Sequence, residues 1–143
     1  MENTNIFVID SSVALKWLHK MNENYLDQAD SIMNKAQESR VTLVMPELAK
    51  YEIGNALLYK NLELPILLLR LIERFYVLPI QFMPEDITLA QITIKIAHKY
   101  KITYYDASFM ALAIKLKTTL ITNNPKHQRK NIENIKVIEL KYY

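Results

Sequence analysis

The sequence has almost no glycine and no cysteine, and these two shortages exclude several kinds of functional site. Gly54 is the only glycine among 143 residues, although a soluble domain of this length ordinarily has about ten. One glycine cannot form a glycine-rich dinucleotide loop, a P-loop or the nucleophile elbow of a hydrolase. Without cysteine there is no disulfide, thiolate zinc site, iron–sulfur cluster or cysteine nucleophile. The three histidines, His19, His98 and His127, lie in unrelated stretches and form no H-x-x-x-H pair. Any chemistry is therefore expected to use carboxylates, hydroxyls, amides and lysines.

The sequence shows neither a signal peptide nor a membrane span. Its first residues lack the positive charge and the long apolar run of a signal peptide. The absence of cysteine suits a reducing compartment, so we expect a cytoplasmic protein. The most apolar window, residues 64–83, contains Arg70, Glu73 and Arg74, and a central charge costs about 2.5–3.5 kcal/mol in a bilayer. This window therefore predicts a buried helix.

Short apolar runs alternate with helical patterns along the chain. Strands are expected at 6–9, 42–45, 80–83, 119–122 and 136–140, and helices at 13–18, 23–38, 46–61, 65–75, 85–100 and 103–117. Pro46 and Pro65 are placed at the first position of their helices, and Asn124 with Pro125 at the start of a short helical turn. The alternation predicts one three-layer α/β/α domain over residues 1–143, with a central, mostly parallel sheet of four to five strands.

Three carboxylates are candidates for chemistry, and each also has a purely structural interpretation. Asp10 directly follows the first strand, where it caps a helix or projects from the strand end beside Ser12. Glu52 lies among apolar neighbours on its helix, so it is at the edge of the buried face, paired, or bound to a ligand. Asp106 follows Thr103 by three residues, as in a capping box, yet it also heads the core side of its helix.

Taken together, the three acids favour a metal site. Carboxylates that are brought together repel one another unless a cation neutralises them. Hard oxygen ligands suit Mg²⁺ or Mn²⁺. Such a cation supports phosphoryl chemistry, because it acidifies a bound water and stabilises the charge that builds on a phosphate.

Four segments, in order along the whole chain, resemble the PIN domain, and most of all the short VapC-type toxin nucleases. They are Ile-Asp10-Ser-Ser12, Pro46-Glu-Leu-Ala-Lys-Tyr-Glu52-Ile-Gly-Asn55, Tyr105-Asp106-Ala-Ser-Phe-Met and Thr119-Leu-Ile-Thr122. The resemblance implies a Mg²⁺- or Mn²⁺-dependent endoribonuclease with a PIN-like α/β/α fold. It also implies a homodimer that a cognate antitoxin holds inactive.

The resemblance also assigns roles to individual residues. The three acidic positions of the family, which are catalytic and bind the metal, correspond to Asp10, Glu52 and Asp106. Asn124 stands where the family commonly has a fourth acid. Its amide oxygen can still bind a metal but adds no negative charge, which favours a single well-occupied cation. Supporting roles are assigned to Ser12, Asn55 and Thr122.

Positive charge is concentrated near the C-terminus and indicates a polyanionic partner. The net charge is +3, and from residue 115 onward there are seven Lys or Arg against two Glu. Lys126, Arg129 and Lys130 follow the last candidate strand end, where they are expected to contact RNA phosphates. Lys16 and Lys20 offer an alternative RNA path. The alternative function is a non-catalytic or weakly active PIN-like module that binds RNA or a protein partner.

Overall fold

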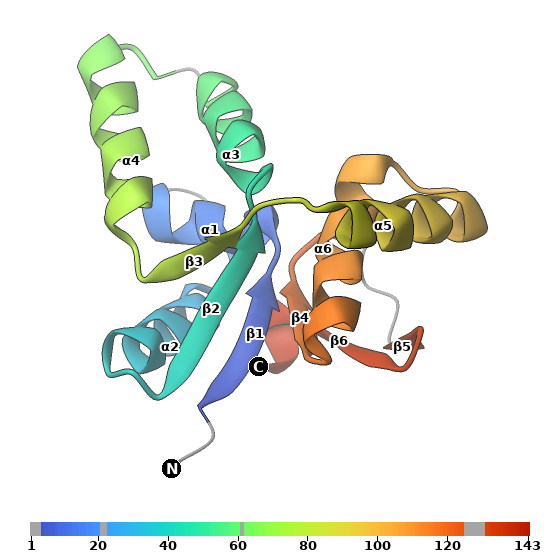
Figure 1. The fold of residues 1–143 in the computed structure, drawn as a ribbon. Helices are drawn as coiled ribbons and strands as arrows, with labels where there is room; N and C mark the ends of the chain where they lie inside the picture. The colour runs from blue at the N-terminus through green and yellow to red at the C-terminus, as the bar shows by residue number, and fades with distance from the viewer. Residues whose placement is uncertain (1–3, 21–22, 61, 125–130) are drawn as a thin grey trace.

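Strands and helices alternate along the chain as the sequence predicts. The computed structural model describes residues 4–20, 23–60, 62–124 and 131–143 (Figure 1). The strands are β1 Asn5–Ile9, β2 Val41–Pro46, β3 Ile80–Met83, β4 Thr119–Thr122, β5 Asn131–Ile132 and β6 Ile135–Glu139. The helices are α1 Ser11–Leu18, α2 Leu26–Gln37, α3 Ala49–Leu58, α4 Pro65–Val77, α5 Ile87–Tyr100 and α6 Tyr104–Leu116, followed by the 3₁₀ turn η2 Leu140–Tyr142.

The sheet has the order β3-β2-β1-β4-β6-β5. All neighbouring pairs from β3 to β6 are parallel, and only β5 runs antiparallel to β6. The predicted mostly parallel sheet is therefore confirmed, with the two-residue strand β5 as an addition that the sequence did not reveal. This order places β1 between β2 and β4, so the carboxyl ends of these central strands lie at one edge of the sheet.

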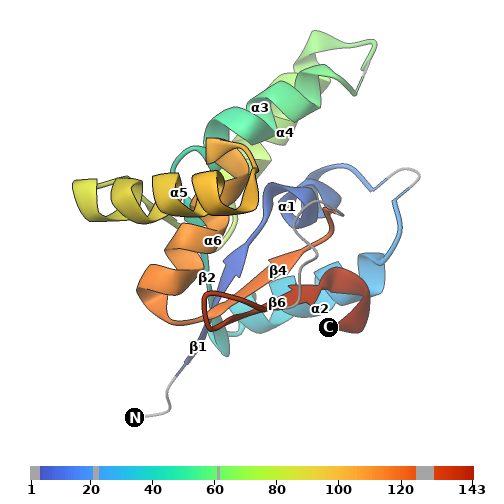
Figure 2. The same cartoon turned by 90° about the vertical axis from the view of Figure 1, so that its right-hand side faces the viewer.

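Helices cover both faces of this sheet. Figure 2 shows α5 and α6 on one side of the strands and α1 and α2 on the other. The central strands are correspondingly apolar on both faces: Val8, Ile9, Leu120 and Ile121 are all fully buried. The three-layer α/β/α fold class is thus confirmed.

Two predicted helix starts were wrong. Pro46 is the last residue of β2, and α3 begins only at Ala49. A proline is tolerated there because the missing N–H falls at the end of the strand. The helix expected from residue 23 begins at Leu26, since Tyr25 takes a left-handed conformation with φ 60°. The helical turn expected at Pro125 lies outside the described residues.

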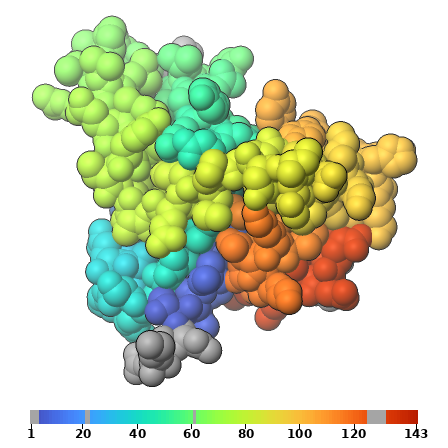
Figure 3. Space-filling view, viewed as in Figure 1, coloured from blue at the N-terminus to red at the C-terminus, as the bar shows by residue number. Residues whose placement is uncertain are grey.

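The apolar window at residues 64–83 is not the buried helix that was expected. It forms α4 and β3, and α4 buries only Phe75. Leu69 is 57% exposed and Val77 is 80% exposed. Together α3 and α4 form a hairpin that projects beyond the sheet (Figures 1 and 3). An apolar pattern with helical spacing indicates that another surface covers the apolar face of the helix. It does not indicate that this surface belongs to the same chain. Within the described residues, no helix is long and apolar enough to cross a membrane.

Candidate active site

Asp10 occupies the point where β1 ends and α1 begins. Its backbone N–H donates to the Ile121 carbonyl oxygen (3.0 Å), which ties this point to β4. Its side chain caps α1: Oδ2 accepts a hydrogen bond from the Ser12 backbone N–H (3.1 Å) and another from the Ser12 hydroxyl. The residue is only 3% exposed. The structure therefore places a nearly buried carboxylate at the carboxyl end of the central strand.

Ser12 links the ends of two neighbouring strands. Its hydroxyl donates to Asp10 and at the same time accepts a hydrogen bond from the Asn123 backbone N–H (2.9 Å). Asn123 follows β4 directly. One serine thus orients the Asp10 carboxylate and holds the segment after β4 against it.

Glu52 joins this arrangement through Ser11. The Ser11 hydroxyl donates to Glu52 Oε1 (3.0 Å), across 41 residues of sequence. Glu52 lies in the first turn of α3 and is half-buried, beside the buried residues Ile53 and Leu57. It therefore stands at the edge of the buried face of its helix and is also held close to the start of α1. Ser11 was not among the predicted site residues, although its position between Asp10 and Ser12 in the sequence indicated it.

Asp106 lies in the first turn of α6, a helix that packs against β1, β2 and β4. Thr103 is the N-cap, and its hydroxyl oxygen accepts the hydrogen bond from the Asp106 backbone N–H (3.0 Å). The cap uses the main chain of Asp106, so its half-buried carboxylate is not the capping group.

The segment after β4 is held by a second hydroxyl. Thr122 is fully buried, and its Oγ1 accepts a hydrogen bond from the Asn124 backbone N–H (3.0 Å). Asn124 is half-buried at the same edge as Asp10. Asn55 is exposed on α3, and its supporting role stays a prediction.

The basic residues fall in different environments. Lys126, Arg129 and Lys130 lie outside the described residues, so their contact with RNA stays a prediction. Lys16 does not fit the alternative RNA path, because its side chain is 2% exposed and its Nζ lies 2.8 Å from Glu23 Oε2. Lys20 is exposed and pairs with Asp30 (3.1 Å).

Glu23 connects α1 to the far end of α3. Its Oε2 binds the buried Lys16 on α1, and its Oε1 accepts a hydrogen bond from Lys60 Nζ (3.2 Å), just beyond α3. Burial alone would raise the pKa of Glu23, but the hydrogen bonds and charges of the two lysines lower it below the usual value. The Ser11–Glu52 hydrogen bond and this ion pair hold α3 against α1 at two separate points.

The chemistry of the donors fits a hard divalent cation. Asp10 and Glu52 present carboxylate oxygens on either side of the Ser11–Ser12 pair, and a nearly buried carboxylate such as Asp10 gains from a neighbouring positive charge. In the described part of the chain, however, no three acidic or histidine side chains already form a group that could hold a metal ion. Binding by all three candidate acids would require their side chains to turn toward one another.

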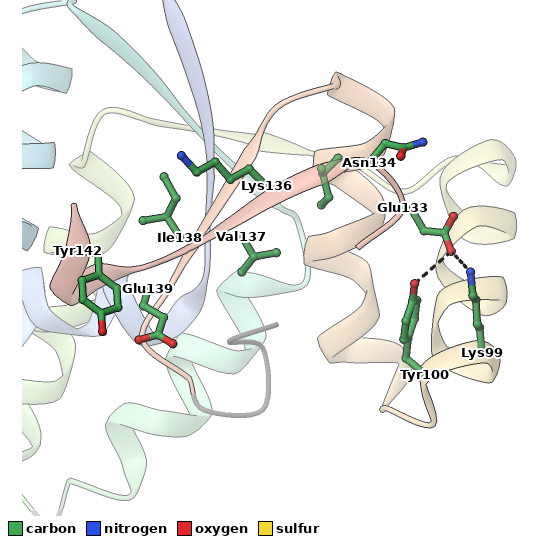
Figure 4. Close-up of a pocket in the computed structure, with 10 residues that line it drawn as sticks. Lys99, Tyr100, Glu133, Asn134, Lys136, Val137, Ile138, Glu139 and Tyr142 are labelled. Carbon is green, nitrogen blue, oxygen red and sulfur yellow. Dashed lines mark hydrogen bonds and ion pairs between the residues drawn. The ribbon is translucent and has the colours of Figure 1, made fainter. Parts of the chain in front are cut away.

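A large cavity lies beside β6. It has a volume of about 840 Å³ and runs along β6, between Lys99 and Tyr100 at one end and Glu139 and Tyr142 at the other (Figure 4). Its lining does not include Asp10, Glu52 or Asp106. The chemical character of the carboxylates, rather than the size of a cavity, therefore marks the candidate site.

The chain is also similar to known proteins. The family model described as PIN domain matches residues 7–133. The chain belongs to the PIN domain family. The match spans all the candidate acids of this PIN-family protein, from the end of β1 to the start of α6. No curated protein matches its sequence significantly.

Solved structures of low sequence identity share the fold of this PIN-family protein. VapBC2 from Rickettsia felis, bound to a DNA fragment from its promoter, is 14% identical with a TM-score of 0.71, covering 94% of this chain and 98% of that one. PAE2754 from Pyrobaculum aerophilum is 18% identical with a TM-score of 0.66, covering 99% and 94%. VapC20 from Mycobacterium tuberculosis, named as a Sarcin-Ricin loop cleaving toxin, is 8% identical with a TM-score of 0.68, covering 91% and 98%.

Proposed function

We propose that this PIN-family protein is a divalent-metal-dependent endoribonuclease and the toxin of a toxin–antitoxin pair. The observation that carries the proposal is the buried Asp10 carboxylate at the carboxyl end of β1, with Glu52 held beside it through Ser11. PIN nucleases generally use divalent metals. One solved neighbour is named as a toxin–antitoxin complex and another as a Sarcin-Ricin loop cleaving toxin, and both names support the proposal of a toxin.

In this proposal the metal is held by oxygen ligands from three elements. Asp10 ends β1, Glu52 comes from α3 and Asp106 from α6, with the Asn124 amide as a further neutral donor. A bound Mg²⁺ or Mn²⁺ would acidify a water and stabilise the negative charge that develops on the scissile phosphate. The oxygen-only donor set suits both cations.

The protein's own residues would position these ligands. Ser12 holds the Asp10 carboxylate by its hydroxyl and its backbone N–H, so that the side chain keeps one orientation. Ser11 does the same for Glu52 with a single hydrogen bond. Partners of this kind matter, because their loss commonly reduces metal affinity or activity by about 10- to 100-fold.

The projecting α3–α4 hairpin supports the presence of a protein partner. On α3 the exposed fractions are 80% for Tyr51 and 68% for Leu58, and on α4 Val77 is 80% exposed. Exposed apolar patches of this extent mark sites of protein–protein interaction. We propose that an antitoxin, a second copy of the chain, or both in turn cover this hairpin.

Metal-dependent cleavage of single-stranded RNA by the purified protein tests the enzymatic proposal. With MnCl₂ the wild type should cleave the RNA, and excess EDTA should stop the reaction. Asp10→Asn and Asp106→Asn should each reduce cleavage by more than about 100-fold, since even outer partners of metal ligands cost up to about that much.

The matched control is Asp30→Asn, because Asp30 is an exposed acid that pairs with Lys20 away from the sheet edge. This variant should cleave at the wild-type rate. Full activity of Asp106→Asn would remove Asp106 from the site. RNA binding by the wild type without any metal-dependent cleavage would instead establish the non-catalytic alternative.

A further inference from the structure

The end of β6 brings another acid to the edge of the sheet where Asp10 lies. Thr122 on β4 is the Cα partner of Glu139 on β6. Ile9 on β1 is the partner of Ile121 on β4, so Asp10, the next residue, stands level with Thr122. Asp10, Thr122 and Glu139 therefore form a row across three neighbouring strands.

The register also decides which face Glu139 occupies. Residues that stand level in a parallel sheet point to the same face, and successive residues of one strand alternate. Figure 4 shows Val137 and Glu139 on one side of β6, with Lys136 and Ile138 on the other. Glu139 therefore shares the face of Thr122 and Asp10. Because neighbouring strands lie about 4.8 Å apart, the main chains of Asp10 and Glu139 are separated by roughly 10 Å.

This separation suits two carboxylates that face one hydrated cation. Mg²⁺ commonly keeps several of its waters in proteins, so acids outside its direct ligand set still accept hydrogen bonds from those waters. The segment after β4 supplies no acid of its own, because Thr122, Asn123 and Asn124 are all neutral. Glu139 is the acid that the fold brings to this side of Asp10.

The present partner of Glu139 holds it only weakly. Lys141 Nζ lies 3.4 Å from Glu139 Oε2, and the Lys141 side chain is 40% exposed whereas that of Glu139 is 18% exposed. A pair with one exposed partner contributes little to stability. The Glu139 carboxylate can therefore exchange this lysine for a cation at little cost.

We propose that Glu139 is an outlying carboxylate of the divalent-cation site, facing the cation from the β6 side. The inference rests on the proposed function, since it requires that Asp10 binds the cation. Glu139 contributes negative charge and an oxygen acceptor for the waters of the cation. It is a positioning residue for the metal and does not replace Asp10, Glu52 or Asp106 as a direct ligand.

Calorimetric titration of the full-length, metal-free protein with MnCl₂ tests this role without any measurement of activity. Glu139→Gln should weaken Mn²⁺ binding by about tenfold, the usual effect of losing a partner around a metal site. Lys141→Met should tighten binding by about twofold, because it removes a weak competitor for the Glu139 carboxylate.

Glu133→Gln is the matched control. Glu133 lies in the same β5–β6 hairpin, pairs with Lys99 and accepts a hydrogen bond from Tyr100 Oη (3.2 Å), away from the sheet edge. The substitution Glu133→Gln changes the net charge by the same amount as Glu139→Gln, and it should leave the Mn²⁺ affinity unchanged. Equal weakening by Glu133→Gln and Glu139→Gln would overturn the inference, as would wild-type affinity in Glu139→Gln.

Asp10→Asn separates the inference from the proposed function. If Asp10→Asn loses Mn²⁺ binding while Glu139→Gln retains it, only the role of Glu139 fails. If neither substitution changes binding, the cation site itself is wrong. Should Glu139→Gln not fold, Lys141→Met still decides, because unchanged or weaker binding in that variant contradicts the role of Glu139.

Discussion

At the scale of single residues, capping a helix and forming a site are compatible roles for Asp10. Its carboxylate accepts the capping hydrogen bond from the Ser12 backbone N–H, as the structural interpretation required. The same bond and the Ser12 hydroxyl fix the carboxylate at the carboxyl end of β1. The two serines after Asp10 form hydrogen bonds to different elements: the Ser12 hydroxyl accepts from the Asn123 N–H after β4, and the Ser11 hydroxyl donates to Glu52 on α3. Local helix chemistry thus assembles the candidate site.

Glu23→Gln is expected to destabilise the fold through the buried lysine that it leaves behind. The Lys16 side chain is 2% exposed. Removal of the negative charge at Glu23 therefore leaves the buried Lys16 ammonium group with an uncompensated positive charge. Breaking one side of a buried pair costs about 3–5 kcal/mol, and we expect about 3 kcal/mol because Glu23 is partly exposed. Urea denaturation at pH 7 measures the difference. The control is Asp30→Gln, which breaks the exposed pair with Lys20 and should cost less than about 1 kcal/mol.

The contribution of Glu23 should also depend on pH in a defined direction. Lys16 and Lys60 lower its pKa in the folded state below the ordinary value of 4.5, against the opposing effect of burial. A carboxyl group whose pKa is lowered by folding stabilises the fold fully when the pH is above its pKa in the unfolded state. This stabilisation is lost as the pH falls through its pKa in the folded state. The stability difference between wild type and Glu23→Gln should therefore be constant above about pH 5 and shrink below pH 4.5. A difference that grows with acid would contradict the assigned ion pair.

At the scale of elements, the N-cap of α6 allows the role of the Asp106 carboxylate to be separated from the stability of the helix. Thr103→Ala removes the hydroxyl that accepts from the Asp106 backbone N–H, and loss of such a cap costs about 1 kcal/mol. Asp106→Asn keeps this bond, which uses the main chain of residue 106, and removes the interaction of the Asp106 charge with the helix dipole, about 0.5 kcal/mol. Thermal unfolding of the two metal-free variants should therefore show the larger loss for Thr103→Ala. A larger loss for Asp106→Asn would mean that its carboxylate has a structural role after all.

Elements were predictable where the pattern was local. The strand at residues 119–122 and the N-cap at Thr103 follow from an apolar run and a capping residue, and the structure has both. Strand β5 could not be predicted, since two residues carry no periodicity and pair only because the chain reverses beside β6. The exposure of α4 could not be predicted either, because the pattern of apolar residues does not say which molecule covers them. The Ser11–Glu52 and Glu23 contacts join residues far apart in sequence, which is why only the structure revealed them.

At the scale of the whole molecule, the order of the elements explains where the three candidate acids stand in an otherwise basic protein. The net charge is +3, with most of the excess positive charge after residue 115. Yet Asp10, Glu52 and Asp106 all come from elements that meet at the carboxyl end of the sheet. The parallel topology accounts for Asp10 and Glu52, because it places the β1–α1 and β2–α3 connections at the same edge of the sheet. Asp106 instead follows the α5–α6 connection. A phosphate would need a cation before it could approach these acids, because their negative charges repel it.

Asn124→Asp tests how the charge of this edge limits cation binding. The Asn124 backbone N–H donates to Thr122 Oγ1, which holds the residue beside the row of Asp10, Thr122 and Glu139. Two divalent ions would bring four positive charges against three negative ones from the direct ligands Asp10, Glu52 and Asp106. Because Glu139 is proposed to act only through the waters of the cation, we expect one well-occupied cation. The added carboxylate should tighten Mn²⁺ binding by about tenfold, or about 1.4 kcal/mol, in calorimetry of the metal-free protein. In the double variant with Glu139→Gln the two effects should cancel if both acids act on the same cation through separate oxygens. Identical affinity and stoichiometry in wild type and Asn124→Asp would show that Asn124 only holds the turn after β4, and the cation would then depend on the acids of β1, α3 and α6.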